Sequence, residues 1–216
     1  MSTLAMTLAA FRDAMIERAG PEKAAAIAAA YQAVLDAGLP EQAVRVGDVA
    51  PDFALPDLSG KEHRLSAELA RGPVVLLFYR GLWCPFCAKA LRAMEKIRPA
   101  LELEGGSMLA VSPQLQATVA EAASSLGLGL TLLHDAGGEV AGRYRLNWTL
   151  PEKLRQLFGK FGHPLAQENG DDGTMLPMLA VYVIGRDGVV VAAKVDPRPT
   201  EWMEPAEALE AVRKAA

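Results

Sequence analysis

The chain has 216 residues, of which 51% are hydrophobic and 22% are charged. This composition excludes a disordered protein, and the length suits one well-buried domain with an extension. The formal net charge of -4 leaves no electrostatic footprint for nucleic acid, and no apolar run approaches the roughly 20 residues of a membrane-spanning helix. We therefore expect neither a nucleic-acid partner nor a membrane partner.

Residues 3–37 are predicted to form two helices. Apolar side chains recur at helical spacing, and Gly20-Pro21 ends the first helix and opens the second. Residues 1–40 are thus interpreted as an N-terminal helical hairpin extension in front of a main domain, residues 41–216. The hairpin could be a dimer arm, a lid or a packing strut. Because it contains no chemical constellation, a strut or a dimer arm is favoured, and a homodimer stays open.

The first ten residues do not have the basic segment of a signal peptide, and Arg12 and Asp13 interrupt their apolar run. A cytoplasmic location is the expectation. The approach to the main domain, residues 41–72, is punctuated by prolines. It is predicted to hold a short strand at residues 63–65 and a helical turn at residues 66–69. His63 is expected on the surface, and nothing in this segment demands a catalytic role.

The stretch from Phe78 to Cys87 joins the end of a strand to the start of a helix. It follows the apolar run 74–78, and a helix is predicted after it over residues 84–103, with a kink at Pro99. The only two cysteines of the chain, Cys84 and Cys87, lie at this junction. Packing alone is a poor explanation for both cysteines at one such place.

A Cys-x-x-Cys pair at a helix start favours a reactive thiol. Free backbone N–H groups and the helix dipole stabilise a Cys84 thiolate, and Pro85 suits the first helical turn, where its missing N–H costs nothing. Cys87, one turn on, can attack a mixed disulfide or a sulfenic acid formed on Cys84. Arg80 is a nearby cation that would help to hold the thiolate.

Two other interpretations of the cysteine pair are a zinc half-site and idle core thiols. A zinc site needs about four ligands, and only His63, His134 and His163 could supplement the pair, none of them at ligand spacing. A redox pair is favoured over both, so no metal and no cofactor is predicted.

From residue 74 onward the pattern alternates strand and helix. The further predicted elements are strands at residues 107–112 and 130–133, helices at residues 113–126 and 137–144, a helical insertion at about 149–175 with its helix at 149–161, strands at residues 179–184 and 189–195, and a last helix at residues 204–215. Gly185-Arg186-Asp187-Gly188 is predicted to be the hairpin turn between the last two strands. This order is that of an α/β protein with a thioredoxin-like three-layer fold, in which helices flank a central mixed sheet.

Three motifs and the cysteine core carry a resemblance to one family. The segments are Val46-Gly47-Asp48-Val49-Ala50-Pro51-Asp52-Phe53, Leu133–Ala141, Tyr182–Gly188 and the core Phe-Tyr-Arg-Gly-Leu-Trp-Cys-Pro-Phe-Cys at 78–87. The chain resembles the peroxiredoxins, the alkyl hydroperoxide reductase and thiol-specific antioxidant family, over nearly its whole length from Val46 on. The helical N-terminus and the insertion are similar to those of a bacterial peroxiredoxin-like branch.

The chain departs from the family at three positions of the site. Typical peroxiredoxins carry Pro after the aromatic residue of the strand, where this chain has Arg80 after Tyr79. Typical peroxiredoxins place Thr or Ser three residues before the peroxidatic cysteine, where this chain has Gly81. They also complete the pocket with an Arg near the start of the late strand, where this chain has Leu179. Thioredoxins need a cis-proline facing the dithiol, and Leu179 occupies that place too, with Pro177 two residues earlier. Neither parent site is therefore intact beyond the dithiol.

The resemblance implies a thiol peroxidase that reduces hydrogen peroxide or organic hydroperoxides. Cys84 would attack the peroxide as thiolate, Cys87 would resolve the sulfenic acid to a disulfide, and an external dithiol such as thioredoxin would recycle the enzyme. Arg80 and backbone N–H groups would stabilise the developing charge. Trp83 would shield the site or form part of a partner-docking surface, although simple packing fits it equally well.

Two alternatives stay open at this point. One is a thioredoxin-like dithiol–disulfide oxidoreductase that acts on protein disulfides, since Trp-Cys-Pro-Phe-Cys fits it as well as it fits a peroxidase. The other is a redox sensor or interaction module without enzymatic activity.

Overall fold

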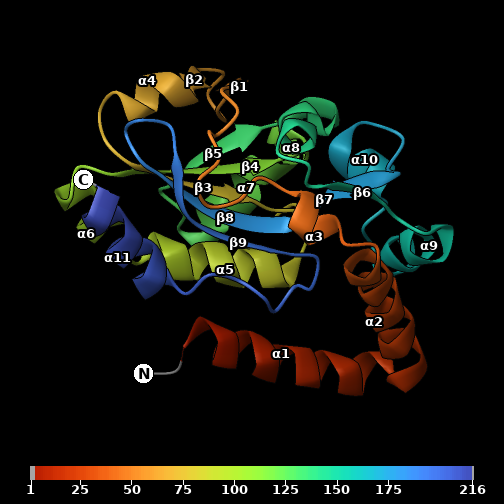
Figure 1. Cartoon of the computed structure of the whole chain (residues 1–216). Coiled ribbons are helices and arrows are strands. Elements are labelled where there is room, and N and C mark those ends of the chain that lie inside the picture. The colour runs from red at the N-terminus through yellow and green to blue at the C-terminus, as the bar shows by residue number, and fades with distance from the viewer. Residues whose placement is uncertain (1–2, 216) are drawn as a thin grey trace.

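The computed structural model describes residues 3–215, and its centre is a five-stranded sheet with the order β5-β4-β3-β8-β9 (Figure 1). The strands are β3 (Val74–Phe78), β4 (Ser107–Ser112), β5 (Thr131–His134), β8 (Leu179–Ile184) and β9 (Val190–Asp196). β4 runs parallel to β3 and β5, whereas β8 is antiparallel to β3 and β9. The sheet is therefore mixed, as predicted.

The sequence of β3 explains its central place. All five of its residues are apolar and buried, which is the pattern of a strand covered on both faces. Val74, Leu76 and Phe78 belong to one core cluster, and Val75 and Leu77 belong to the other. Alternation along the strand thus divides the core into two layers, one on each face of the sheet.

Helices contribute to both layers. The first layer is built by α2 (Pro21–Asp36), α4 (Leu65–Leu69), α8 (Glu139–Arg143), α9 (Glu152–Lys160) and α10 (Leu165–Asn169). The second is built by α1 (Leu4–Ala19), α5 (Pro85–Glu95), α6 (Arg98–Leu103), α7 (Gln116–Leu126) and α11 (Pro205–Ala215). In Figure 1, α5 and α11 lie below the sheet and α4 and α8 above it. This arrangement confirms the predicted three-layer, thioredoxin-like fold.

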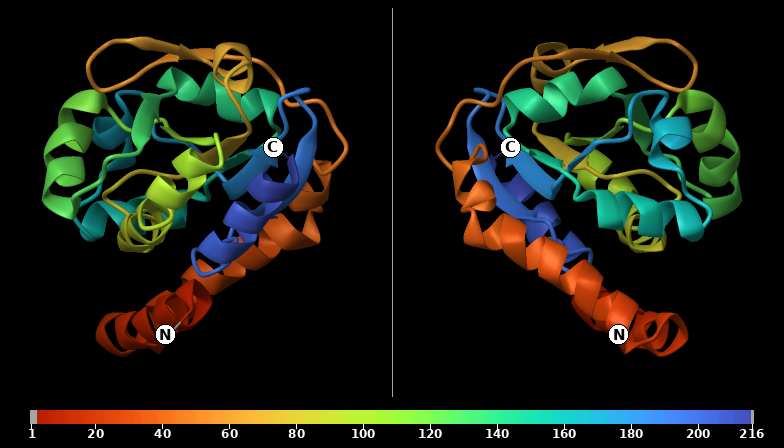
Figure 2. Two further views of the ribbon diagram at one scale, coloured as in Figure 1. Left: turned by 90° about the vertical axis from the view of Figure 1, so that its left-hand side faces the viewer. Right: turned by 90° about the vertical axis from the view of Figure 1, so that its right-hand side faces the viewer.

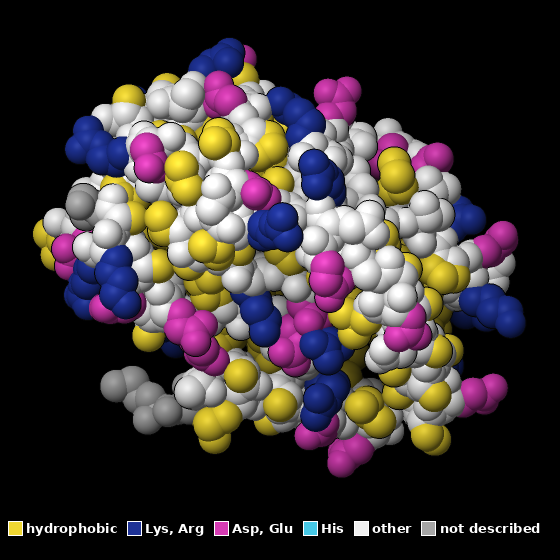
Figure 3. All heavy atoms as spheres, in the orientation of Figure 1, with side chains coloured by type: hydrophobic (Ala, Val, Ile, Leu, Met, Phe, Trp, Pro, Cys, Tyr) yellow, Lys and Arg dark blue, Asp and Glu magenta, His cyan; other side chains and the backbone are white. Residues whose placement is uncertain are grey.

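The remaining elements are short. They are α3 (Leu39–Gln42), β1 (Ala54–Pro56), β2 (Glu62–Arg64), the 3-10 turn η1 (Ala136–Gly138), β6 (Asn147–Thr149) and β7 (Met175–Pro177). β1 pairs with β2 and β6 pairs with β7, each antiparallel. Among residues 3–215, no helix has the length and apolar character that crossing a bilayer requires. Figure 3 shows acidic and basic side chains interspersed over one face, in keeping with the small net charge.

The N-terminal helix pair, α1 and α2, is separated at Gly20, whose φ of 84° suits glycine. In Figures 1 and 2, α1 runs below α5 and α2 turns away along the side of the domain. Glu204 accepts hydrogen bonds from the N–H groups of Leu4 (2.9 Å) and Ala5 (2.8 Å). The ring of Phe11 packs edge-on against Phe86 of α5, with centroids 5.0 Å apart. The pair is thus attached to the domain at its first turn and along α5.

Two predicted helices begin or end elsewhere in the structure. The helix expected over residues 84–103 is two helices, because Pro99 has no N–H to donate to the carbonyl of Glu95 and its ring crowds that carbonyl, and α5 ends at Glu95. The helix expected from Pro113 begins only at Gln116. Residues 113–115 form a loop instead. This loop lets the side chain of Gln114 reach the site described below.

The insertion and His63 also differ from expectation. Thr149, expected to start the inserted helix, ends β6, and α9 begins at Glu152. His63 is buried, not on the surface: its Nδ1 lies 3.0 Å from Glu68 and its Nε2 lies 3.0 Å from Asp57. Two carboxylates from neighbouring turns satisfy both ring nitrogens, and a buried polar ring needs such partners.

The C-terminal hairpin follows the prediction. Gly185 donates to the carbonyl of Val189 (2.9 Å), and Gly188 donates back to Gly185 (2.9 Å). Gly188 has a φ of 82°, which explains glycine at this place in the turn.

Candidate active site

Cys84 is the residue that caps the N-terminus of α5. Its carbonyl accepts the first helical hydrogen bond, from Ala88 (3.0 Å), and Pro85 is the first residue of the helix, as predicted. Cys84 has extended backbone angles and only 5% of its surface is exposed. The thiol therefore lies where the free N–H groups of the first helical turn converge.

Cys87 lies one turn further into α5 and is completely buried. Both cysteines are free thiols. The hydrogen bond from Cys87 lowers the pKa of Cys84 to about 6 against the opposing effect of burial, and the charge of Arg80 and the N–H groups of Cys87 and Phe86 assist it. Burial and the donation to Cys84 raise the pKa of Cys87. The geometry thus favours Cys84 as the nucleophile and Cys87 as its protonated partner.

Arg80 is a buried cation two residues after the end of β3, with 2% of its surface exposed. Its Nη1 donates to the hydroxyl of Tyr31 (2.7 Å), and its Nη2 donates to the carbonyl of Pro197. The guanidinium also lies 4.9 Å from the centre of the Tyr31 ring. Its Nε is buried without a hydrogen-bond partner among residues 3–215. Arg80 is therefore held in place through Nη1 and Nη2, and its Nε–H is left unpaired.

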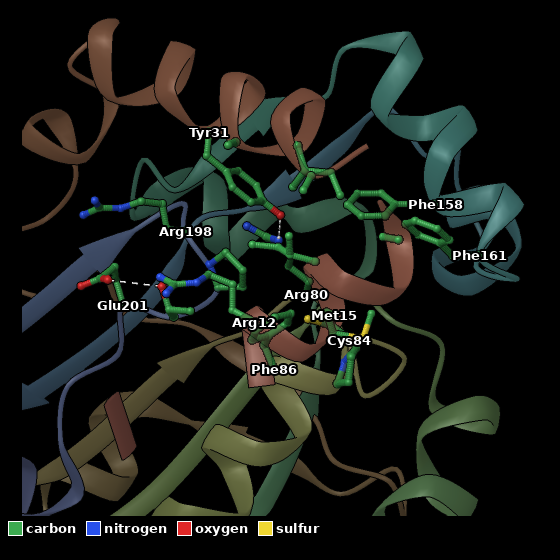
Figure 4. Close-up of a pocket in the computed structure, with 18 of the residues that line it drawn as sticks. Arg12, Met15, Tyr31, Arg80, Cys84, Phe86, Phe158, Phe161, Arg198 and Glu201 are labelled. Carbon is green, nitrogen blue, oxygen red and sulfur yellow. Dashed lines mark hydrogen bonds between the residues drawn. The ribbon is translucent and has the colours of Figure 1, made fainter. Parts of the chain in front are cut away.

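Tyr31 of α2 is a site residue that the sequence analysis missed. Its side chain points from α2 toward Arg80 (Figure 4), and its ring packs edge-on against Trp148, with centroids 6.1 Å apart. Burial raises the pKa of Tyr31, so its phenol stays protonated at neutral pH. In the sequence, Tyr31 is only one member of an apolar helical stripe. Arg80 could have pointed to such a residue, because a buried guanidinium has only donors and needs acceptors such as a tyrosine hydroxyl.

Gly81 occupies a position where a side chain has no room. Its φ is 147°, and a Cβ atom there would lie 2.3 Å from Nε1 of Trp83 and 2.9 Å from Oε1 of Gln114. The same Gln114 oxygen accepts a hydrogen bond from the N–H of Leu82 (2.7 Å). The hydroxyl that typical peroxiredoxins carry here is thus replaced by the indole of Trp83.

Trp83 connects the cysteine loop to the insertion. Its ring centroid lies 5.6 Å from Phe158 of α9 and 5.5 Å from His163, which follows α9. Its Nε1 is buried and has no hydrogen-bond partner among the described residues. The structure places Trp83 beside the site as a packed, partly buried side chain, with α9 covering it.

A pocket of about 620 Å³ opens beside Cys84. Figure 4 shows Tyr31 pointing toward Arg80 in the middle of the view, with Phe158 and Phe161 on one side and Arg198 and Glu201 on the other. The lining comes from both N-terminal helices, the cysteine loop, the end of α9 with the turn after it, and the loop 198–201. Cys84 lines this pocket and Cys87 does not. A small molecule in the pocket would therefore meet the sulfur of Cys84 first.

Two further positions singled out in the sequence are Leu179 and Pro177. Leu179 is buried in the core cluster that contains both cysteines, and Pro177 lies in β7, where it pairs with Asn147. Within residues 3–215, every peptide bond is trans and no three His, Cys, Asp or Glu side chains gather in a way that would hold a metal ion.

A mixed sheet whose central strand leads into a helix opened by two thiols defines a thioredoxin-like fold. Residues 46–193, more than half of the chain, match the AhpC/TSA family. The chain belongs to this family, and the resemblance stated from its motifs is confirmed.

Relatives of two kinds are similar to this chain. The thiol-disulfide oxidoreductase ResA of Geobacillus kaustophilus is 37% identical over 107 residues, which are 48% of this chain and 59% of that protein. The match thus spans less than two thirds of that relative. The crystal structure of peroxidoxin BcpB from Mycobacterium tuberculosis has a TM-score of 0.63 and 25% identity, and it covers 80% of this chain and 99% of that one.

A third structure agrees in fold alone. A peroxiredoxin-like protein from Aquifex aeolicus has a TM-score of 0.62 at 18% identity, with 81% of this chain and 89% of that chain covered. The family match and the fold therefore show a thioredoxin-like member of the AhpC/TSA family, and proteins named peroxiredoxins and thiol-disulfide oxidoreductases are both found among its relatives.

Proposed function

We propose that the protein is a thiol peroxidase in which Cys84 is the peroxidatic cysteine and Cys87 the resolving cysteine. The observation that carries this proposal is the position of Cys84. Its thiol has a pKa lowered to about 6, lies beside the buried cation of Arg80, and lines a pocket large enough for a small molecule.

In the first step, the Cys84 thiolate attacks the terminal oxygen of a hydroperoxide, ROOH. A sulfur–oxygen bond forms, the oxygen–oxygen bond breaks, and the leaving alkoxide or hydroxide takes up a proton to become ROH. Negative charge moves from sulfur to the leaving oxygen. The unpaired Nε–H of Arg80 and the N–H groups at the start of α5 are the donors available to stabilise it.

In the second step, Cys87 attacks the sulfur of the Cys84 sulfenic acid, and water leaves as the disulfide forms. The two residues are one helical turn apart, and the Cys87 thiol is close enough to lower the pKa of Cys84. Resolution therefore needs no unfolding of α5. An external dithiol then reduces the disulfide to the two thiols and is itself oxidised to a disulfide.

Access to the sulfur favours a peroxide over a protein disulfide as the oxidant. With 5% of its surface exposed, Cys84 can be approached through the pocket, which admits small molecules. A protein disulfide must bring its own sulfur into line with the attacking sulfur at the surface. Phe86 and side chains of the helix pair line the pocket around Cys84 and narrow the approach of such a partner. The same barrier predicts that small dithiols recycle the enzyme more readily than protein dithiols.

The second candidate is a thioredoxin-like disulfide oxidoreductase, and the identity to ResA favours it. The same Cys84 thiolate would then attack a disulfide, with Cys87 releasing the mixed disulfide. The pair of low and high thiol pKa values serves this reaction equally well. The oxidant is what separates the two candidates.

The test is stopped-flow tryptophan fluorescence of the reduced protein, mixed in turn with hydrogen peroxide and with a peptide disulfide. Trp83 is next to Cys84 in sequence and should report its oxidation. A rate constant for peroxide far above that of a free thiol, abolished by Cys84→Ser, supports the peroxidase. A peroxide rate no faster than that of a free thiol, together with fast reduction of the disulfide, would instead support the second candidate.

A further inference from the structure

The first step of the proposed reaction needs a proton for the leaving oxygen. When the Cys84 thiolate attacks a hydroperoxide in line, the leaving oxygen stands on the far side of the attacked oxygen from the sulfur. It therefore projects into the pocket that Cys84 lines. Arg80 stabilises charge there, but a guanidinium does not give up a proton in a protein. Because hydroxide and alkoxides are strong bases, a proton donor on the pocket wall would lower the barrier.

Few of the described side chains that line the pocket can give up a proton. Apart from the nucleophile and the arginines, the titratable ones are Tyr31, His163 and Glu201. Burial raises the pKa of Tyr31, which makes its phenol a weaker acid. Glu201 pairs with Lys194 (3.7 Å) and lies on the opposite side of the view in Figure 4 from Phe158. His163 remains, and imidazole is the side chain that most often transfers protons near neutral pH.

His163 packs against the tryptophan of the cysteine loop. It follows α9, and its ring centroid lies 5.5 Å from that of Trp83, with an angle of 33° between the rings. Trp83 directly precedes Cys84 in sequence, and all three residues line the pocket. The contact thus brings the imidazole to the Cys84 side of the pocket.

Glu168 of α10 orients the imidazole. Its Oε1 lies 3.4 Å from Nδ1 of His163, and catalytic hydrogen bonds are often this long before a substrate binds. With Glu168 at Nδ1, Nε2 on the opposite side of the ring is left to meet a molecule in the pocket. The other oxygen of Glu168 accepts from Gln114 (3.0 Å), which in turn accepts from the N–H of Leu82 (2.7 Å). A chain of hydrogen bonds therefore connects the imidazole to the cysteine loop.

We propose that His163 is a catalytic residue, the proton donor of the peroxide step, and that Glu168 positions it. The inference rests on the proposed peroxidase function. As the sulfur–oxygen bond forms and the oxygen–oxygen bond breaks, Nε2 of the protonated imidazole gives its proton to the leaving oxygen, which departs as water or an alcohol. The disulfide then forms with loss of water. When the external dithiol reduces it, Cys84 returns as a thiol, and the ionisation of this thiol restores the proton to His163.

The experiment compares two oxidants with different leaving groups, hydrogen peroxide and peracetic acid, by stopped-flow tryptophan fluorescence. Attack on hydrogen peroxide expels hydroxide, which needs a proton, whereas attack on peracetic acid expels acetate, a much weaker base that needs none. His163→Phe keeps a ring against Trp83 but has no proton to give. We expect the rate constant for hydrogen peroxide to fall about 100-fold and that for peracetic acid less than about threefold. A residue that only packs would give equal changes with both oxidants.

Two further variants sharpen the comparison. Glu168→Gln keeps an oxygen for Gln114 and loses the charge that faces His163, so its loss with hydrogen peroxide should be smaller than that of His163→Phe. His134→Gln is the matched control, because Nδ1 of His134 lies 2.9 Å from the carbonyl oxygen of Gln114 but His134 does not line the pocket. It should leave the ratio of the two rate constants as in the wild type.

The outcomes separate this inference from the proposed function. If the wild type reacts rapidly with both oxidants and folded His163→Phe keeps the same ratio of rate constants, the role of His163 is refuted and the peroxidase stands. If the wild type reacts with both oxidants no faster than a free thiol, the peroxidase and the role of His163 are refuted together. His163→Gln gives the same test if the phenylalanine variant does not fold.

Discussion

The cysteine loop and the N-terminal helix pair contribute differently to one site. Residues 78–87 lie within the family domain and carry the reactive groups, because β3 and α5 fix Arg80 and Cys84 on either side of the turn. The helix pair contributes no nucleophile. It supplies Tyr31, which holds Arg80, and a large share of the apolar wall. Reactivity and the shape of the pocket thus come from separate parts of the chain.

The largest expected effect lies in the loop. Cys84→Ser should abolish the rapid reaction with peroxide, because the serine hydroxyl is not ionised at neutral pH and is a weak nucleophile. Cys87→Ser should leave the first oxidation in place and stop at the sulfenic acid, which mass spectrometry after dimedone trapping detects. Fast peroxide consumption by the Cys84→Ser variant would show that Cys84 is not the peroxidatic cysteine.

The second effect also lies in the loop. Arg80→Met removes a buried cation that favours the thiolate, so the pKa of Cys84 should rise. The loss of this cation from the transition state should bring the total fall in rate to about 100-fold at pH 7. The pH profile of the reaction, read with thiolate absorbance at 240 nm, measures the two contributions separately.

Arg80→Lys is the control for this variant. It keeps a positive charge but cannot reach both Tyr31 and Pro197, so its rate should fall between those of wild type and Arg80→Met. Circular dichroism shows whether each variant is folded. An unchanged pH midpoint in a folded Arg80→Met protein would show that Arg80 does not lower the pKa of Cys84.

The pH dependence of the wild type gives a smaller effect. The pKa of Cys84 is lowered to about 6, and only the thiolate reacts. The rate constant should therefore be near its plateau at pH 7 and should fall about tenfold by pH 5, since one pH unit below the pKa leaves roughly a tenth of the thiol ionised. A midpoint near 8 or 9, as for an ordinary thiol, would show that the groups around Cys84 do not lower the pKa of its thiol.

The contrast between the two regions also explains what the sequence could predict. β3, the helix opened by Pro85 and the turn Gly185–Gly188 follow from local patterns: a continuous apolar run, a proline at a helix start and paired glycines. These signals act over a few residues, so they do not depend on the rest of the fold. The positions of Cys84 and Cys87 at the start of α5 follow from the same local signals.

The missed features depend on residues far apart in sequence. Tyr31 and Arg80 are separated by 49 positions, and Tyr31 is an ordinary member of an apolar stripe until the fold brings α2 to the sheet. Gln114 reaches Leu82 across 32 positions. His63 is buried only because Asp57 and Glu68 fold around it. Such tertiary contacts determine burial and partners, and local sequence patterns do not contain them.

The smallest effect lies where the two regions meet. Tyr31→Phe keeps the ring over the guanidinium but removes the hydroxyl that accepts from Nη1 of Arg80. A buried donor left without its acceptor costs about 1–3 kcal/mol of stability. Because Nη2 still donates to the carbonyl of Pro197, Arg80 should stay near Cys84. We expect the peroxide rate to fall only a few-fold, with the pH midpoint moved slightly upward.

Tyr144→Phe is the matched control for Tyr31→Phe. The Tyr144 hydroxyl is also in the core layer of α2 and donates to the carbonyl of Pro51 (3.0 Å), but it does not contact Arg80 or line the pocket. Urea unfolding should show a comparable loss of stability in both variants, and only Tyr31→Phe should change the pH profile. If both variants slow the reaction equally, Tyr31 acts through general stability and not through Arg80, and the helix pair contributes only the wall of the pocket.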